Sequence, residues 1–109
     1  MGKASGSRDR RDTGTAEVEA SVVVTGEIDM ATAPTLTRDL QTAIREHPAR
    51  VLVDLSAVDF LDSCGINALV RAHRLAEGFG VEMVLESPNE MCQRVLKVAG
   101  LDGLFRIEG

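Results

Sequence analysis

The chain has 109 residues, 44% of them hydrophobic and 3% aromatic, and its formal net charge is −5 at pH 7. This length allows one domain with one core and is too short for two. The acidic balance and the lack of Trp and Tyr argue against a nucleic-acid partner, because phosphate backbones attract clustered Lys and Arg and bases stack on aromatic rings. No apolar run approaches the length that crosses a bilayer, and none follows the basic N-terminal residues, so we expect a cytoplasmic protein without a membrane span or secretory signal.

Charge is distributed unevenly along the chain. Residues 1–15 are rich in Gly, Ser and Arg and hold four basic and two acidic side chains, which leaves eight basic and fifteen acidic side chains in residues 16–109. We predict a disordered tail over residues 1–15 and one acidic folded domain over residues 16–109. The two cysteines, Cys64 and Cys92, lie in helical patterns without metal-ligand spacing, so we expect reduced thiols with no metal site and no disulfide framework. We also expect no cofactor.

The first half of the domain alternates between strand and helix patterns. Residues 17–25 are rich in β-branched residues and predict one strand or a short pair that ends at Gly26. A helix follows, with Thr32 as its cap, Pro34 in its first turn and an end before His47-Pro48. Residues 50–55 then predict a buried strand, and residues 56–59 predict a turn.

The second half continues the alternation. A helix begins near Ser63 and is broken by Gly78 and Gly80, and residues 81–86 form the next strand. The segment from Ser87 to Glu90 has the pattern of a capping box, with Ser87 as the cap of a third helix and Gly100 at its end. Residues 104–107 predict a short closing strand. The alternation predicts a single α/β domain, a small and mostly parallel sheet packed with helices.

One serine stands at the junction between a strand and a helix. Ser63, in Asp62-Ser63-Cys64-Gly65, follows an apolar strand-like run and begins an amphipathic helix. Helix N-termini offer unpaired N–H groups and a partial positive charge, so this hydroxyl can cap the helix or carry a phosphate that the helix end would hold. The two alternatives are an ordinary N-cap and a phosphorylation switch.

Four stretches of sequence carry a specific resemblance. They are Gly26-Glu27-Ile28-Asp29, Ala33-Pro34, the run from Val53 to Gly65 that ends in the D-S-x-G motif, and Val95-Leu96-x-x-Ala99-Gly100-Leu101. Over residues 17–107 the chain resembles the STAS domains of bacterial anti-sigma factor antagonists. Cys64 stands where many relatives have a second serine or another small residue, which leaves Ser63 as the only hydroxyl of the motif.

The resemblance implies a partner-switching mechanism in transcription regulation and stress response. Ser63 would be phosphorylated by a partner that is both anti-sigma factor and serine kinase, and ATP and metal would belong to that kinase. The unphosphorylated protein would bind the kinase and release a sigma factor. The phosphorylated protein would not bind until a serine phosphatase restores it. A phosphate adds roughly 1.5 to 2 negative charges, so we expect direct steric and electrostatic exclusion of the partner rather than a global rearrangement.

Seven residues near Ser63 are candidates for partner binding. Glu27 and Asp29 end the first strand at the sheet edge where Ser63 is delivered, and the alternative for both is a solvated turn. Asp62 either contacts the partner or favours the helix end. Gly65 either permits a close backbone approach or leaves room for the kinase, and Ile66 is a contact or a core residue. The full set is Glu27, Asp29, Asp62, Cys64, Gly65, Ile66 and Asn67.

Two other classes of function compete with this interpretation. A hydrolase with Ser63 as nucleophile is disfavoured, because the chain lacks a G-x-S-x-G turn and offers no obvious His with an acid to activate the hydroxyl. We therefore expect no enzyme activity. The stronger alternative is a STAS docking subunit of another assembly, such as a stress-signalling scaffold or a lipid-transport complex. The intact D-S-x-G motif favours the phosphorylation switch.

Overall fold

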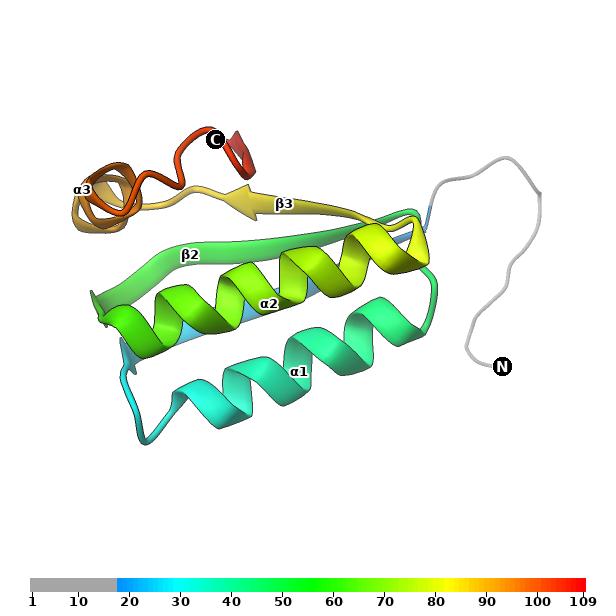
Figure 1. Ribbon diagram of the computed structural model, residues 1–109, viewed down its shortest axis with the longest axis horizontal. Coiled ribbons are helices and arrows are strands. Elements are labelled where there is room, and N and C mark those ends of the chain that lie inside the picture. Colours follow the sequence, from blue (N-terminus) through cyan, green and yellow to red (C-terminus); the bar gives the residue numbers. More distant parts are fainter. Residues whose placement is uncertain (1–17) are drawn as a thin grey trace.

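The computed structural model describes residues 18–109, where four strands alternate with three helices (Figure 1). The strands lie in the order β1-β2-β3-β4 and every neighbouring pair is parallel, which confirms the predicted α/β class. The predicted tail, residues 1–15, lies outside the described residues. None of the helices within residues 18–109 is long and apolar enough to span a bilayer. The elements are β1 (Glu19–Ile28), α1 (Ala33–Arg45), β2 (Arg50–Leu61), α2 (Ser63–Phe79), β3 (Glu82–Glu86), α3 (Glu90–Val98) and β4 (Arg106–Glu108).

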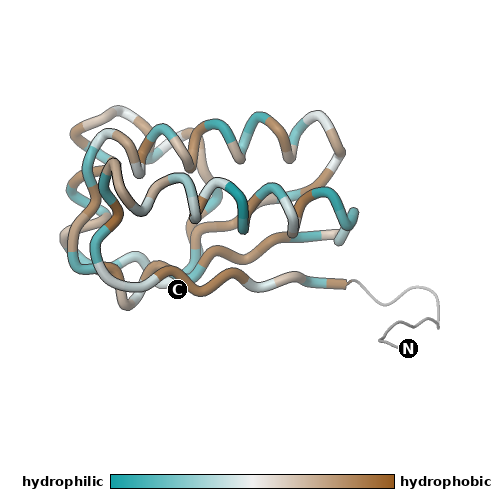
Figure 2. The backbone as a smooth tube through the Cα atoms, turned by 90° about the horizontal axis from the view of Figure 1, so that it is seen from below, coloured by the Kyte–Doolittle hydropathy of each residue, from teal (hydrophilic) through white to brown (hydrophobic). Residues whose placement is uncertain are grey.

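The core lies between the sheet and the helices on one of its faces. Figure 2 shows the helical layer along one side of the sheet, and α1 and α2 lie side by side in that layer. In α1 the buried residues recur every three or four positions, at Leu36, Leu40 and Ile44, which gives the helix one apolar stripe. In β2 every second residue from Val51 to Leu55 is buried, so one face of the strand meets the helices.

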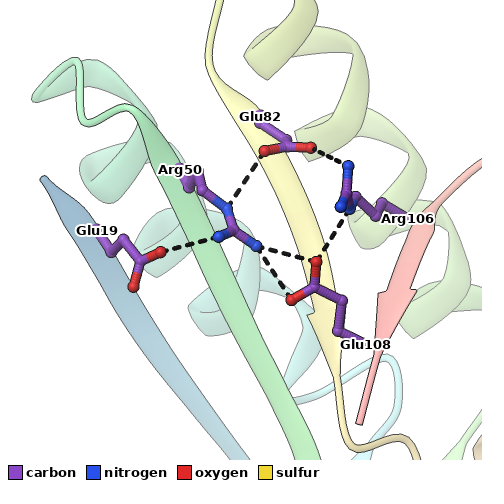
Figure 3. A network of polar contacts seen from close by, with 5 residues as sticks. All are labelled: Glu19, Arg50, Glu82, Arg106 and Glu108. Atoms are coloured by element: carbon purple, nitrogen blue, oxygen red, sulfur yellow. Dashed lines mark hydrogen bonds and ion pairs between the residues drawn. The ribbon is translucent and has the colours of Figure 1, made fainter. Parts of the chain in front are cut away.

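The alternate residues of the strands point to the opposite face, where charged side chains form a network (Figure 3). The guanidinium of Arg50 lies 2.9 Å from Glu19, 3.2 Å from Glu82 and 3.1 Å from Glu108. Arg106 lies 3.2 Å from Glu82 and 3.0 Å from Glu108. Three carboxylates and two guanidinium groups therefore connect all four strands on the face that α1 and α2 leave bare.

The first two strands are longer than predicted. β1 runs through Gly26 to Ile28, and β2 continues to Leu61 where the sequence predicted a turn over residues 56–59. The pairing of β1 with β2 shifts register twice, between Val23 and Thr25 and again after Gly26, so β2 absorbs its extra residues as bulges. The side chain of Asp54 accepts hydrogen bonds from the backbone N–H and the hydroxyl of Ser56, which satisfies polar groups at the first bulge and lowers the pKa of Asp54.

Two further boundaries differ from the sequence prediction. α3 begins at Glu90 and its N-cap is Asn89, so the assignment of Ser87 as the cap is wrong. The Asn89 amide accepts a hydrogen bond from Cys92 N–H and also donates one to the Val58 carbonyl in β2, a double role that a serine hydroxyl at position 87 does not fill. β4 spans Arg106–Glu108, later than predicted, because its pairing with β3 starts at Arg106.

Candidate functional site

The junction of β2 and α2 is held by Asp62. Asp62 is the N-cap of α2, and its Oδ1 accepts hydrogen bonds from the N–H groups of Cys64 at 2.8 Å and Gly65 at 3.2 Å. Its own N–H donates to the carbonyl of Ile28 in β1, so the cap is also tied to the sheet edge. The alternative of Ser63 as an ordinary N-cap is wrong, because the preceding carboxylate does that work.

Ser63 is the first residue of α2 and its side chain is exposed. Its hydroxyl makes no hydrogen bond with any residue of 18–109. A phosphate on this hydroxyl would meet a helix end whose N–H groups at Cys64 and Gly65 already donate to Asp62, so it would compete with a neighbouring carboxylate instead of entering an empty anion site. The hydroxyl is thus chemically available and structurally dispensable.

Gly65 is a packing residue of the first turn of α2. It is buried, and an added Cβ would lie 2.5 Å from Leu61 Cδ1 and 2.7 Å from Ile28 Cγ2. Both side chains belong to the core at the ends of β2 and β1. Of the two explanations for this glycine, the structure favours the close approach of the backbone.

The end of β1 brings two more candidates to the same edge. Ile28 pairs with Leu61 and Glu27 pairs with Phe60, so Glu27 and Asp29 lie beside the β2–α2 junction, as parallel strands require. The Asp29 carboxylate accepts hydrogen bonds from the N–H groups of Ala31 and Thr32 and so orders the turn into α1. The Glu27 side chain is exposed and forms no ion pair with residues 18–109.

Two grooves flank the N-terminal half of α2. The α1 groove, between α1 and α2, has a volume of about 400 Å³ and is lined by Met30, Ala33, Pro34, Thr37, Cys64, Asn67, Ala68 and Arg71. The α3 groove, between α2 and the end of α3, has a volume of about 540 Å³ and is lined by Ser63, Cys64, Ile66, Asn67, Val70, Ala99 and Leu101. Cys64 and Asn67 line both grooves. Cys64 and Asn67 therefore form a ridge between two largely apolar depressions, with Ile66 on the side of the α3 groove and Gly65 buried beneath.

Comparison with known proteins decides the family. The family model of the STAS domain matches residues 13–109. This chain belongs to the STAS domain family. The STAS domain is 31% identical over 88 residues to the anti-sigma-F factor antagonist RsfB of Mycobacterium tuberculosis (strain CDC 1551 / Oshkosh), a match that covers 81% of this chain and 71% of RsfB.

Solved structures agree with the family. The crystal structure of an anti-sigma factor antagonist from Mycobacterium paratuberculosis is 32% identical, with a TM-score of 0.69 and coverage of 92% of this chain and 80% of that chain. The anti-sigma factor antagonist SpoIIAA of Bacillus is 19% identical and shares the fold in its unphosphorylated form, at a TM-score of 0.71, with coverage of 87% of this chain and 83% of that chain. Its phosphorylated form gives a TM-score of 0.66, with coverage of 87% and 86%. The expected STAS-type α/β fold is confirmed.

Several residues that line the grooves of the STAS domain were not predicted from the sequence as site residues. Val70 and Arg71 continue the ridge of α2, and helical spacing from Ser63, Ile66 and Asn67 could have identified both. Met30 and Leu101 come from segments before α1 and after α3, and their place beside α2 is set by tertiary packing, for which local sequence carries no signal.

Neither histidine of the STAS domain is placed to activate Ser63. The ring of His47 packs edge-on against Phe79 at 5.0 Å, at the other end of α2. The ring of His73 packs against Phe105 at 5.3 Å, and its Nδ1 lies 3.8 Å from Glu77. Neither lines a groove beside Ser63. Within residues 18–109, neither histidine is therefore positioned as the general base that a serine nucleophile needs.

Proposed function

We propose that this STAS domain is an anti-sigma factor antagonist whose binding is controlled by phosphorylation of Ser63. The unphosphorylated domain binds an anti-sigma factor that is also a serine kinase, and this binding releases a sigma factor. The observation that supports the proposal is the Ser63 hydroxyl, which is exposed, lines the α3 groove and makes no hydrogen bond with residues 18–109. The relatives named as anti-sigma factor antagonists support it independently.

The unphosphorylated surface suits a close protein contact. Ile66 and Val70 of α2 line the α3 groove together with Leu101, and Met30, in the wall of the α1 groove, is 78% exposed. A partner that covers α2 removes this apolar surface from water, which favours association. A small neutral hydroxyl can be covered in the same step when the partner supplies a hydrogen bond to it, and the cost is far lower than that of covering a charged phosphate.

Phosphorylation of Ser63 changes the charge and hydration of that surface without a change of fold. The phosphate adds roughly 1.5 to 2 negative charges and a tightly held hydration shell next to the Asp62 carboxylate. A partner that covers the site would have to strip water from both groups, so it is excluded. The fold tolerates the change, because Asp62 and not Ser63 caps α2. A serine phosphatase then restores the hydroxyl, and ATP and metal are supplied by the kinase.

The test is capture from the native lysate with four baits. We expect the wild-type and Ser63→Ala chains to retain an anti-sigma factor with a kinase fold, and Ser63→Asp to lose it. Thr42→Asp, an exposed position of α1 that lines neither groove, controls for added charge and retains the partner. Mass spectrometry identifies the captured protein, and incubation with ATP shows whether it phosphorylates Ser63. Equal retention of a permease or scaffold by all four baits would refute the proposal and favour a docking subunit.

A further inference from the structure

One charged side chain lies in the walls of the two grooves within residues 18–109. Arg71, two turns after Ser63 on α2, is exposed and lines the α1 groove. Every other residue that lines either groove within 18–109 is uncharged. Arg71 forms no ion pair with another residue of that range. Among residues 18–109, Arg71 is therefore the one guanidinium in the walls of the two grooves, and it has no counterion within that range.

The helix fixes how far the backbone of Arg71 lies from the acidic end of the site. Arg71 is eight positions after Ser63, which is about 12 Å along the axis of a helix. At the Ser63 end, Asp62 caps α2 and the β1–β2 pairing brings Glu27 and Asp29 alongside. Charge is therefore separated along α2, with carboxylates beside the start of the helix and a guanidinium two turns later.

A protein that covers the α1 groove also covers the Arg71 guanidinium and has to supply a counterion for it. Removing a charge from water without a counterion is costly, and the cost grows beside apolar side chains. A partner with a carboxylate opposite Arg71 recovers the cost through an ion pair in a site of low dielectric. A partner with an apolar group or a cation at that point is rejected.

We propose that Arg71 is a specificity-determining residue of the partner surface and pairs with a carboxylate of the anti-sigma factor over the α1 groove. The inference rests on the proposed function and deepens it, because it fixes the orientation of the partner. The partner places an acidic side chain over the α1 groove, about 12 Å further along the axis of α2 than the point at which it covers the Ser63 hydroxyl in the α3 groove. An anti-sigma factor without that acidic side chain is discriminated against.

The probe is the purified anti-sigma factor that the Ser63→Ala chain retains. Dissociation constants are measured by titration calorimetry for full-length wild type, Arg71→Glu, Arg71→Lys and Arg74→Glu. Arg74 lies one turn further along α2, is exposed and lines neither groove, so Arg74→Glu makes the same charge change outside the surface. We expect Arg71→Glu to weaken binding by about tenfold or more, Arg71→Lys to stay near wild type, and Arg74→Glu to have little effect.

Other outcomes separate this inference from the proposed function. Equal, small effects of Arg71→Glu and Arg74→Glu would overturn the role of Arg71, while loss of binding by Ser63→Asp would leave the phosphorylation switch standing. If the Ser63→Ala chain retains no anti-sigma factor, both fall together. Thermal unfolding of the two glutamate variants is measured in parallel, and a lowered melting temperature for Arg71→Glu alone would assign its effect to the fold and refute the inference.

Discussion

Two neighbouring residues divide the work at the start of α2. The carboxylate of Asp62 accepts hydrogen bonds from the N–H groups of Cys64 and Gly65, whereas the hydroxyl of Ser63 has no hydrogen-bond partner within residues 18–109. The residue that holds the helix is thereby separate from the residue that can be modified. A chemical change at Ser63 can then act on a binding partner without releasing the helix end.

The first prediction tests this division. Asp62→Ala removes the cap and should lower the free energy of unfolding by about 1 kcal/mol. Asp62→Asn keeps an acceptor oxygen at the cap and should retain most of that stability, and Ser63→Ala should be close to neutral. Urea denaturation followed by circular dichroism measures all three. A loss for Ser63→Ala as large as that for Asp62→Ala would contradict the assignment of the cap.

The second prediction concerns the glycine at the next position but one. Glycine to alanine in a helix normally gains about 1 kcal/mol, but at Gly65 the new Cβ meets Leu61 and Ile28, and such overpacking costs about 1–3 kcal/mol. Gly65→Ala should therefore destabilise the domain. Gly78 lies in the same helix with nothing within 4 Å of the added atom, so Gly78→Ala should stabilise it. Equal effects at the two positions would show that contact with β1 and β2 does not decide the outcome.

At the scale of elements, α3 forms one wall of the α3 groove through the turn that follows it. Its first turn is fixed by Asn89, whose oxygen accepts Cys92 N–H at 2.9 Å and whose amide donates to Val58 O at 2.7 Å. The second bond joins the helix to β2, the strand that delivers Asp62 and Ser63. The position of the wall and the position of the hydroxyl thus depend on one strand.

The third prediction follows from these two bonds. Asn89→Ser keeps a cap but cannot reach the Val58 carbonyl, and Asn89→Ala keeps neither bond. A cap and a hydrogen bond each contribute about 1 kcal/mol, so the free energy of unfolding should fall in the order wild type, Ser, Ala. Chemical denaturation checks the order. If the Ser variant equals wild type, the bond to β2 contributes nothing to stability.

The sequence predicts the elements better than their ends. The spacing of Leu36, Leu40 and Ile44 and the alternation from Val51 to Leu55 are local patterns, so the order of strands and helices could be predicted. The cap of α3 could not, because Asn89 is favoured by a carbonyl 31 positions away in the chain. The site divides in the same way. Ser63 could be predicted because its motif is local, whereas the two grooves beside it could not, because they depend on where α1 and α3 pack.

At the scale of the whole molecule, the two faces of the sheet differ in what they contact. The covered face packs against the helices that carry the site, and the bare face holds the sheet together through Arg50, Arg106 and three glutamates (Figure 3). β4 spans only Arg106–Glu108, and its two charged side chains add ion pairs with Glu82 and Arg50 to its backbone pairing with β3. The hydrogen bond from Arg106, followed by that from Arg50, lowers the pKa of Glu108.

The fourth prediction is a loss of stability in acid that depends on Glu108. A carboxyl group whose pKa is lowered by folding stabilises the fold above its unfolded pKa of about 4.3, and this contribution is lost as the pH falls through the lowered folded value. Wild type should therefore lose stability below about pH 5, whereas Glu108→Gln should start lower at neutral pH and lose less in acid. Glu46→Gln is the matched control, because Glu46 forms no ion pair with residues 18–109, and it should follow wild type. Thermal unfolding across this pH range measures the stability of the three proteins. If the stability of Glu108→Gln falls with pH as steeply as that of wild type, another group is responsible for the loss in acid. The next group to test is the carboxyl of Asp54, whose pKa is also lowered.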